Sequence, residues 1–583
     1  TQKDPTINID GKTALLGDKV YYRVNIDASR LTDTAYKVWR LGMTDDYDQE
    51  YLTLDAKHVE ILDETGRDRT GEFNIQDKDG VLYAFAKTVD TQIPATGETV
   101  PGDPQPDDLK AYSEKTDKDY DPLKDPSIDQ SLLGHTYQVV MPMTVTKVKD
   151  GHTVENTATQ VTNDKRDKTN TVTNPLKEIN PTKDVTVQVG GDSIDGKSVY
   201  LNHTFLYRLD SSILPPDRAY QTVTDWGGTD QLNTEYDQYL GNWAVYASRD
   251  LYRDGQMLAA KGEKIAGSGF DSSKFGGNLF TVDADENGKV TADATQAYLD
   301  LVSADNEHEA GWVLYLQCKR IAVADEVPNT WTETINGQPR ESNKVVTKTP
   351  DMTPSIHLEK VDTPTLKQDG QEQADRDDPK QALKMDADSI GITFIITNTS
   401  KTDPATGDGA WFKASDLNLA DSTIVGDAHV DMDSLTYPAD WDTLVLKPGE
   451  SVSVTGTLKG VKEGDTHTDR AIVTGTPLVE CAPSNGDPFN DKTDGGEDTD
   501  PEYSTGDVTE IDGKQLCADT QTASNTDDWN GYRAKPLAST GTAVLGLAGG
   551  ALAVLLAGGS LLVFRKRHYA QGSGRHTAVN AGK

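Results

Sequence analysis

The chain has 583 residues, of which 35% are hydrophobic, with a formal net charge of −38 and a pI near 4.5. One hydrophobic core does not serve a chain of this length, so several domains are expected. The acidic charge argues against nucleic acid and anionic lipid as partners and favours a well-solvated exterior. Val, Ile, Tyr, Trp and Leu recur in patterned clusters, which argues against disorder along the whole chain.

Most of the chain is predicted to form β-strands. Runs of β-branched and aromatic residues at 20–26, 199–201 and 243–247 are bounded by Gly, Asp, Asn and Pro turns. One short helical stripe covers 293–303, and the stretch 91–131, rich in Pro, Asp and Lys, is expected to be a surface insertion. Regular strands with frequent turns predict tandem immunoglobulin-like antiparallel β-sandwiches.

Two long segments repeat one pattern. The string Ile-Asp-Gly-Lys occurs at 9–12 and 194–197, and a Tyr-Arg pair follows at 22–23 and 207–208. Near the end of each copy, two asparagines lie fourteen positions apart, at Asn156 and Asn170 and again at Asn329 and Asn343. Ordered similarity of this length indicates two copies of one domain, predicted at 1–178 and 179–352.

A third, different sandwich is predicted for residues 353–483, where alternating strands flank a Pro-Gly turn. Residues 484–536 are acidic and rich in Gly and Thr, which predicts a disordered tether. Cys481 and Cys517 flank this stretch and are expected to form a disulfide in an oxidising compartment; the alternative is two free thiols. Cys318 lies in a strand-like run and is expected to be buried in a core.

Each predicted domain carries a lysine on its first strand and an amide or acid on its last strand. In the second domain these are Lys183 and Asn329, and Asp230 is the candidate helper acid. A neutral lysine amine beside a carboxamide can form an amide and expel ammonia. Burial favours both the neutral amine and the protonated acid that would relay protons. Three aromatic residues are expected to supply dry surroundings, namely Trp226, Trp243 and Phe205.

Several strings in residues 1–350 are shared with one known family. They are Ile-Asp-Gly-Lys, Thr-Asp-Asp-Tyr-Asp at 44–48, Cys-Lys-Arg-Ile-Ala-Val at 318–323, Thr-Ile-Asn-Gly at 334–337 and Ser-Asn at 342–343. This part of the chain resembles the tandem C-terminal domains of the antigen I/II family of streptococcal-type surface adhesins. The resemblance implies elongated sandwiches closed by Lys–Asn isopeptide bonds with a helping Asp.

Carried over by motif, the bond of the second domain joins Lys183 to Asn329 with help from Asp230. In the first domain the resemblance implies a bond to Asn156, helped by Asp45 or Asp46, with Lys3 as the available lysine. Asn170 and Asn343 remain alternative partners.

The third domain departs from this pattern. Lys360 lies on its first strand, Asp469 on the strand expected to be its last, and Asp421 in the place of the helper acid. A Lys–Asp isopeptide bond that releases water is one interpretation, and an ordinary solvated aspartate is the other. A bond of either kind forms once within the chain, so it does not make the protein an enzyme.

The C-terminal residues 537–583 contain three consecutive elements. A pentapeptide precedes an apolar run at 542–564, and a basic cluster follows at 565–567; the pentapeptide is Leu537, Ala538, Ser539, Thr540 and Gly541. The apolar run is long enough for a transmembrane helix. The arrangement resembles a cell-wall sorting signal. The resemblance implies cleavage by a sortase after Thr540 and attachment to peptidoglycan, with the membrane contacted only before sorting. The alternative is an ordinary single-pass anchor.

Motifs for other chemistry are weak. The segment 283–288 resembles the start of a calcium loop, but Ala294 stands where the twelfth-position Glu is needed, and Asn287-Gly288 is better interpreted as a hairpin turn. No GxSxG, HExxH, CxxC or phosphate loop is present, and the histidines lack metal-ligand spacing. No metal site and no cofactor are therefore predicted, with calcium the one possible exception, because the antigen I/II family carries calcium in comparable domains.

The sequence is interpreted as a fragment of a cell-wall-anchored adhesin on a Gram-positive cell. The chain begins at Thr1 without an export signal, so further domains upstream are expected. Three sandwiches would form a stiff stalk, and the ligand would be a host glycoprotein or another surface molecule. Two alternatives are a subunit of a sortase-assembled pilus, although the segment 435–439 has Ala where a pilin-type motif needs Lys, and the stalk of a wall-bound hydrolase.

Overall fold

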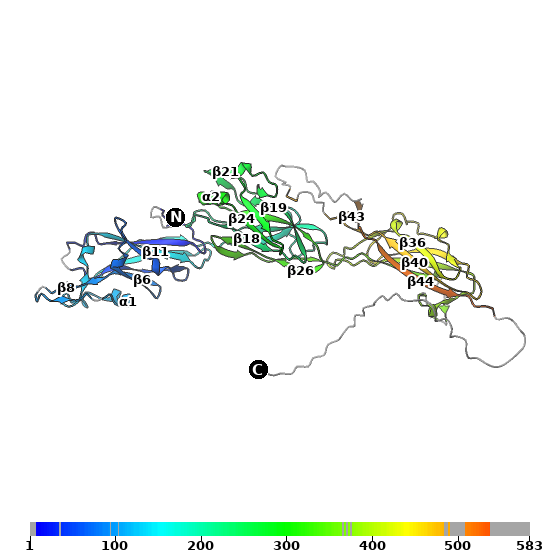
Figure 1. The fold of residues 1–583 in the computed structure, drawn as a ribbon, viewed down its shortest axis with the longest axis horizontal. Helices are drawn as coiled ribbons and strands as arrows, with labels where there is room; N and C mark the ends of the chain where they lie inside the picture. Colours follow the sequence, from blue (N-terminus) through cyan, green and yellow to red (C-terminus); the bar gives the residue numbers. More distant parts are fainter. Residues whose placement is uncertain are drawn as a thin grey trace, which may run out of the picture.

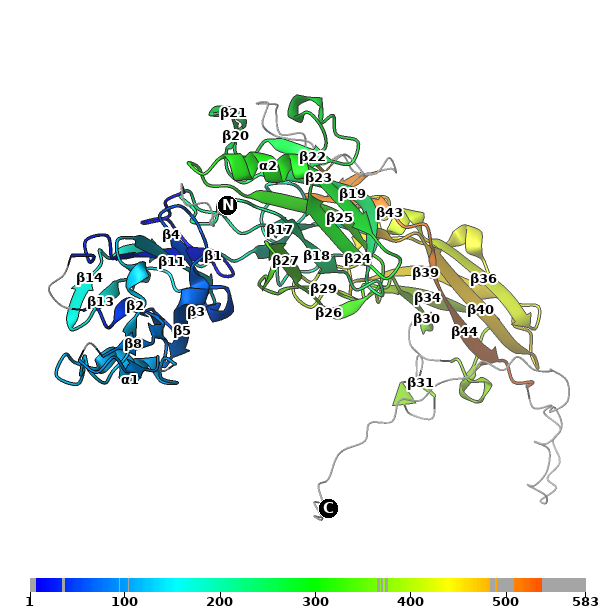
Figure 2. The ribbon, with the colours of Figure 1, turned by 60° about the vertical axis from the view of Figure 1, so that its left-hand side comes forward.

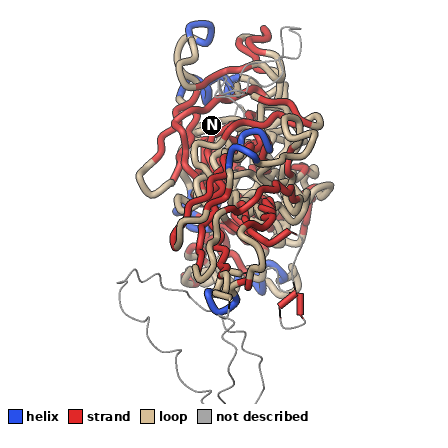
Figure 3. Tube along the Cα trace, turned by 90° about the vertical axis from the view of Figure 1, so that its right-hand side faces the viewer, coloured by secondary structure: helices blue, strands red, loops and turns tan. Residues whose placement is uncertain are grey.

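The computed structural model describes residues 7–33, 37–93, 95–102, 104–363, 367–368, 371–372, 376–482, 488–489 and 508–536. These residues form three β-domains in a row (Figure 1), and strands dominate the view along the row (Figure 3). The predicted tandem all-β architecture is confirmed. The predicted transmembrane helix at 542–564 lies outside the described residues. Within the ranges given above, no helix has the length and apolar character needed to cross a bilayer.

The first domain packs two sheets around one apolar core. One sheet contains β1 (Lys19–Asp27), β11 (Thr136–Val145), β3 (Leu52–Leu54) and β4 (Glu60–Asp63). The other has the order β14 (Lys165–Lys168), β13 (Ala158–Thr162), β2 (Leu41–Asp46), β6 (Val81–Ala86) and β5 (Phe73–Lys78), and β12 (Thr153–Asn156) pairs separately with β15 (Val172–Pro175).

The predicted surface insertion at 91–131 is partly built into the first domain. It contains β8 (Thr91–Gln92), β9 (Thr99–Val100), α1 (Leu109–Glu114) and β10 (Ser127–Ile128), which pairs with β7 (Thr88–Val89). Leu109 and Tyr112 of α1 are buried against Trp39 and Phe85. The insertion therefore covers an apolar patch on the outer face of the second sheet.

The second domain repeats the plan around a larger aromatic core. One sheet has the order β16 (Thr182–Thr186), β17 (Thr204–Asp210), β25 (Trp312–Arg320), β19 (Asp237–Ala247) and β22 (Lys264–Gly267). The other has the order β23 (Phe280–Ala284), β24 (Lys289–Ala294), β18 (Trp226–Gln231), β27 (Trp331–Ile335) and β28 (Gln338–Glu341). Separate pairs join β26 (Ala324–Asn329) to β29 (Val345–Thr349) and β20 (Leu251–Arg253) to β21 (Gln256–Ala259). The helix predicted at 293–303 is α2 (Gln296–Ala304), which lies beside β20 (Figure 2).

The third domain also contains two sheets. The first has the order β30 (Ile356–Thr363), β34 (Ser389–Asn398), β39 (Ser451–Lys459) and β37 (His429–Val430). The second has the order β33 (Leu383–Lys384), β44 (Ala523–Tyr532), β40 (Thr466–Gly475) and β36 (Asn418–Val425). Smaller pairings involve β31 (Lys367–Gln368) with β32 (Gln371–Glu372), and β35 (Phe412–Lys413) with β38 (Val445–Leu446). A three-stranded sheet has the order β41 (Leu478–Glu480), β43 (Lys514–Ala518) and β42 (Thr509–Ile511).

The predicted boundary of the third domain at residue 483 is wrong, and so is the assignment of all of 484–536 to a tether. Strand β44 pairs with β40 over its full length, and Trp529 is completely buried in the core. Side chains of β44 also accept hydrogen bonds from β30, since Asn525 binds the Leu358 amide at 3.0 Å. The prediction failed because the composition of this segment is acidic and polar, whereas its one tryptophan anchors the strand.

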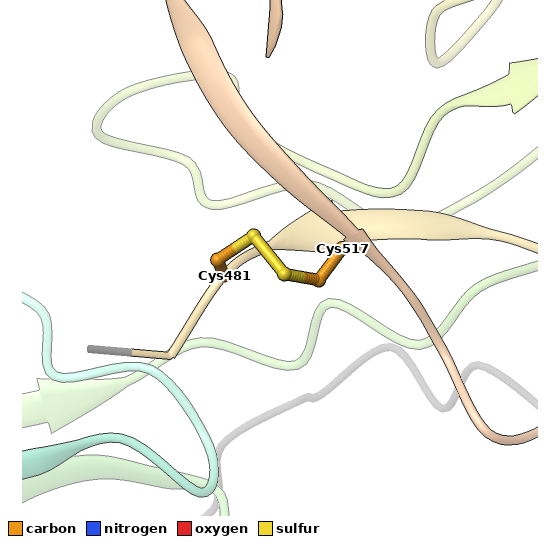
Figure 4. Close-up of a disulfide and its surroundings, with 2 residues drawn as sticks. All are labelled: Cys481 and Cys517. Atoms are coloured by element: carbon orange, nitrogen blue, oxygen red, sulfur yellow. A yellow bond between two sulfur atoms is a disulfide. The ribbon is translucent and has the colours of Figure 1, made fainter. Parts of the chain in front are cut away.

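A disulfide joins Cys481 to Cys517, whose Cα atoms lie 4.9 Å apart (Figure 4). Strand β41 pairs with β43 next to it, with Val479 opposite Cys517. The pairing predicted from sequence is therefore present in the structure, as part of a small sheet rather than within a tether. Cys318 is buried in the core of the second domain.

The first two domains interlock at their joint. Leu15 belongs to the core of the second domain, and Ala219 belongs to the core of the first. The Ala219 amide donates to the Thr13 carbonyl at 2.7 Å, and Lys12 forms an ion pair with Asp217. Exchange of apolar residues and backbone hydrogen bonds across a joint restricts the rotation of one domain against the other.

Trp529→Ala should destabilise the third domain by roughly 3–5 kcal/mol, the usual cost of removing a buried tryptophan. Urea unfolding followed by protease sensitivity of each domain would measure this effect. Tyr437→Ala, at a side chain that is 42% exposed, is the control and should leave stability nearly unchanged. Equal stability of the two variants would contradict a structural role for β44.

Candidate functional site

Strand alternation places charged residues among the inward-facing positions of each sandwich. On β16, Lys183 shares the buried face with Val185, and on β2, Asp45 shares it with Leu41 and Met43. Because successive side chains in a strand point to opposite faces, a polar residue in this register is buried between the sheets. The alternation of side chains along each strand therefore places Lys183 and Asp45 in the interior.

In the second domain, the Lys183 amine forms a hydrogen-bonded ion pair with Asp230. The two side chains are 0% and 1% exposed. The amine also lies 4.5 Å from the centre of the Tyr207 ring. Burial lowers the pKa of the Lys183 amine, and the Asp230 carboxylate opposes this shift. The arrangement favours an amine that can lose its proton.

Asn329 lies at the end of β26 in the same region. Its partner on β29 is Val345, two residues after Asn343, which exchanges two hydrogen bonds with the backbone of Lys183. Trp331, two residues after Asn329, pairs with Asp230 and donates its indole hydrogen to the Thr182 carbonyl at 3.0 Å. Lys183 and Asp230 are thus paired, and the buried Asn329 lies two residues before the strand partner of Asp230.

The Asn329 side chain is only 6% exposed, and neither its amide oxygen nor its amide nitrogen has a hydrogen-bond partner. A buried amide without partners costs about 1–3 kcal/mol for each unsatisfied group. By contrast, the exposed Asn343 uses its amide to hold the Lys183 backbone, so it is a positioning residue for the strand.

A second buried network adjoins the lysine. The Tyr207 hydroxyl donates to Asp237 at 2.8 Å, and Asp237 lies 2.9 Å from Arg320. Burial raises the pKa of the Tyr207 phenol, so this ring stays neutral beside the amine. Sequence reasoning missed Tyr207 as a member of the site, although it is the tyrosine of the repeated Tyr-Arg pair. Trp226 and Phe205 are buried as expected, whereas Trp243 is only partly buried.

In the first domain, Asn156 donates to Asp45 at 3.1 Å, and both side chains are buried. Burial raises the pKa of Asp45 to about 6, and the Asn156 hydrogen bond opposes the shift. Asp46 points outward and is exposed, which distinguishes the two acids that the sequence left open. Asn170 is also exposed. Lys3 lies outside the described residues.

In the third domain, the Lys360 amine lies between two carboxylates. It donates to Asp421 at 2.5 Å, and it lies 2.6 Å from Asp469. The three side chains are at most 2% exposed. Burial raises the pKa of Asp421, the Lys360 ammonium opposes this, and the Asp469 carboxylate adds to it. Two acids that share one cation in a dry site cannot both remain ionised without a large cost.

His467 is a further member of this third cluster that sequence reasoning missed. Its ring nitrogen lies 3.1 Å from Asp469, and the side chain is 1% exposed. Strand alternation was the available signal, because His467, Asp469 and Ala471 share the buried face of β40. The expectation that Asp469 lies on the last strand is wrong, since β40 is an inner strand between β44 and β36.

The other predicted sites are placed as follows. The segment at 283–288 contains the end of β23 and the turn to β24, in which the Asp285 carboxylate accepts hydrogen bonds from the Asn287 and Lys289 amides. Among the residues that the structure describes, no group of three His, Cys, Asp or Glu side chains is placed to hold a metal ion. The pentapeptide at 537–541 lies outside the described residues.

Comparisons with known families match the first two domains. A family described as "Cell surface antigen I/II C2 terminal domain" matches residues 1–176, and one described as "Cell surface antigen C-terminus" matches residues 180–350. The two matches meet between residues 176 and 180, and both end before β30 begins.

The similar proteins include three from different bacteria. Aggregation substance of Enterococcus faecalis (strain ATCC 700802 / V583) is 30% identical over 324 residues, which are 55% of this chain and 21% of that protein. The chain thus spans about a fifth of the length of this relative. The C-terminal domain of the AgI/II polypeptide BspA of Streptococcus agalactiae is 19% identical with a TM-score of 0.43, covering 59% of this chain and 97% of that chain. The C-terminal domain of AspA of Streptococcus pyogenes, an antigen I/II-family protein, is 22% identical with a TM-score of 0.43, covering 58% and 95%.

The raised pKa of Asp45 predicts a pH dependence of the first domain. Its folded-state pKa of about 6 exceeds the ordinary 3.8, so its contribution to stability is fully present below about pH 4 and is lost as the pH rises through 6. Asp45→Asn should remove this loss, which amounts to roughly 2–3 kcal/mol. Peroxide oxidation of the buried Met43 across a urea gradient measures it.

The control is Asp46→Asn at the exposed neighbour, which should keep the pH dependence of the unsubstituted protein. If Asp45→Asn and Asp46→Asn gave the same pH profile, the buried carboxyl would not be the titrating group.

Proposed function

Because the chain belongs to the antigen I/II family of cell surface antigens through residues 1–350, we propose that it is part of a surface adhesin and that its three domains form a self-crosslinked stalk. The observations that support this best are the buried ion pair of Lys183 with Asp230 and the buried Asn329 amide without hydrogen-bond partners. A covalent bond between lysine and asparagine would remove the unsatisfied polar groups.

The proposed reaction in the second domain joins two side chains and releases ammonia. The neutral Lys183 Nζ attacks the Asn329 side-chain carbonyl carbon, and protonated Asp230 donates a hydrogen bond to the carbonyl oxygen. The new bond joins Nζ to the carbonyl carbon, and the bond from that carbon to Nδ2 breaks. One proton of the amine passes through Asp230 to the departing nitrogen, which leaves as ammonia.

The first and third domains support related reactions. Asp45 and Asn156 match the acid and amide of the second domain, and the proposed lysine is Lys3. In the third domain, Lys360 Nζ would attack the carboxyl carbon of Asp469 while Asp421 relays the proton. That reaction releases water, because the leaving group is a hydroxyl rather than an amide nitrogen.

The role proposed for these bonds is mechanical. Lys183 lies on the first strand of its domain, and Asn329 lies on β26 near the end of the same domain. A covalent link between them would carry tension through the domain without peeling strands from its edge. It would also lower the entropy of the unfolded chain, as a disulfide does.

At the cell surface, the proposed arrangement places the stalk between the wall and a ligand-binding region. Sortase would join Thr540 to peptidoglycan, and the apolar run at 542–564 would hold the chain in the membrane before that step. The proposed ligands are host glycoproteins or molecules on partner cells. The charge of −38 favours an extended, well-solvated surface for this role.

The mass of the intact, reduced chain tests the crosslinks. Residues 1–536 should be lighter than the sequence mass by one ammonia for the second domain, by a second ammonia if Lys3 has reacted with Asn156, and by one water if Lys360 has reacted. Lys183→Ala and Asn329→Ala should each remove one ammonia deficit and make the second domain more sensitive to protease.

Asn343→Ala is the matched control, because its side-chain amide binds the Lys183 backbone rather than the amine, and the pairing of β16 with β17 still holds that strand. It should retain the mass deficit. A deficit that survives in Asn329→Ala but disappears in Asn343→Ala would reassign the bond, and a full sequence mass in the unsubstituted chain would refute it.

Thr540→Ala should release the protein from the wall fraction of producing cells, because the proposed cleavage follows this residue. Muralytic digestion and immunoblotting of the wall fraction measure the attachment. Ser539→Ala in the same pentapeptide is the control and should stay attached. Persistent wall linkage of Thr540→Ala would exclude the proposed sorting site.

A further inference from the structure

The outer face of one sheet in the second domain carries an apolar patch. Its members are buried although they face away from the core, and they are Leu206, Ala244, Tyr246, Val313 and Tyr315. The neighbouring inward residues on the same strands belong to the main core. An outward sheet face in a sandwich is ordinarily polar, so a buried apolar group there indicates a covering element.

Phe489 covers this patch together with Val189, which packs against the same cluster. Phe489 is 6% exposed and belongs to the same apolar cluster. Its carbonyl accepts a hydrogen bond from the Tyr246 hydroxyl at 3.0 Å, and the Pro488 carbonyl accepts one from the Val189 amide at 3.3 Å. The Lys264 amine lies 5.4 Å from the Phe489 ring. Pro488 and Phe489 thus make apolar, hydrogen-bonding and cation–π contacts with the second domain.

These two residues come from the third domain's part of the chain. They lie between Cys481 and Cys517, whose disulfide is fixed beside β41 and β43. Figure 1 shows β43 at the end of the third domain that faces the second. The disulfide therefore holds both ends of the segment close to the second domain, which raises the effective concentration of Phe489 at the patch.

Other contacts at this joint are polar. The Ser198 hydroxyl donates to Asp403 at 2.8 Å, and the Tyr200 hydroxyl donates to Asp408 at 3.2 Å. These groups are buried or part-buried, since Asp403 is 1% exposed, so the polar contacts also help to hold the joint. The Phe489 contact adds an apolar contribution to these polar contacts.

We propose that this patch is a docking site for an aromatic side chain, and that Pro488–Phe489 of the same chain is its occupant. The docked segment is a second connection between the two domains, in addition to the direct linker near residue 353. It stiffens the stalk at the joint where the family matches end. This inference does not depend on the isopeptide crosslinks, since the patch contains none of the residues proposed to form them.

Hydroxyl-radical footprinting of the full chain tests the proposal. Phe489→Ala should increase oxidation of Tyr246 and Tyr315 several-fold, while Tyr298 in the core stays protected. Small-angle X-ray scattering of the Phe489→Ala protein should show a broader distribution of molecular dimensions than that of the unsubstituted protein. Val508→Ala, at a 40% exposed residue between the same two cysteines, is the matched control and should change neither measurement. Unchanged oxidation of Tyr246 in Phe489→Ala would overturn the proposal.

A peptide separates docking from an indirect effect. A synthetic peptide of residues 484–494 should restore protection of Tyr246 in the Phe489→Ala protein, and the same peptide with Ala at 489 should not. Equal effects of the two peptides would overturn the aromatic docking site. Protection that grows with concentration of the unsubstituted protein would show that another copy supplies Phe489, and it would overturn docking within one chain.

The disulfide has its own test. The double variant Cys481→Ser and Cys517→Ser should increase Tyr246 oxidation, but by less than Phe489→Ala, because the aromatic residue is still present on a less restricted segment. No increase would refute the role of the disulfide in holding the segment at the joint.

Discussion

The second and third domains each bury a lysine amine between two β-sheets, and the structure around it must compensate that charge. A buried ammonium is tolerated only when an acid compensates it, and the acids themselves must then lose their contact with water. In the second domain Asp230 meets this demand, and in the third Asp421 and Asp469 share it. The aromatic residues around the Lys183 amine, including Tyr207, exclude water, so the amine and the Asp230 carboxylate must lie close together.

The same constraint explains why the clusters bridge the two sheets of a domain. Lys360 lies on a strand of one sheet, while Asp421 and Asp469 lie on strands of the other. The ion pairs of Lys360 therefore hold the two sheets in one position relative to each other. A sandwich whose sheets slide would separate these charges in a dry interior, which is more costly than separating apolar side chains.

The joints between domains use a different principle. Leu15 and Ala219 are exchanged between the first two cores, and the patch around Tyr246 is covered by Phe489. Apolar residues cross each boundary, and short polar contacts surround them. An elongated chain with a large negative charge resists collapse, and these joints limit its bending, so the row of domains seen in Figure 1 follows from both.

The sequence by itself determined the all-β class and the two repeated domains, because each depends on local pattern or spacing. It also supplied the cysteine pair and most polar residues of the buried clusters as candidates. The sequence left Asp45 and Asp46 as alternatives, and the structure separates them, because Asp45 is buried in the register of Leu41 and Met43. Only the tertiary structure decided that β44 completes the third domain, that His467 and Tyr207 adjoin the buried lysines, and that Phe489 docks on the second domain. The reason is that these contacts join residues far apart in the chain, which local patterns do not reveal. A single aromatic anchor in an acidic segment also has little effect on the composition of that segment.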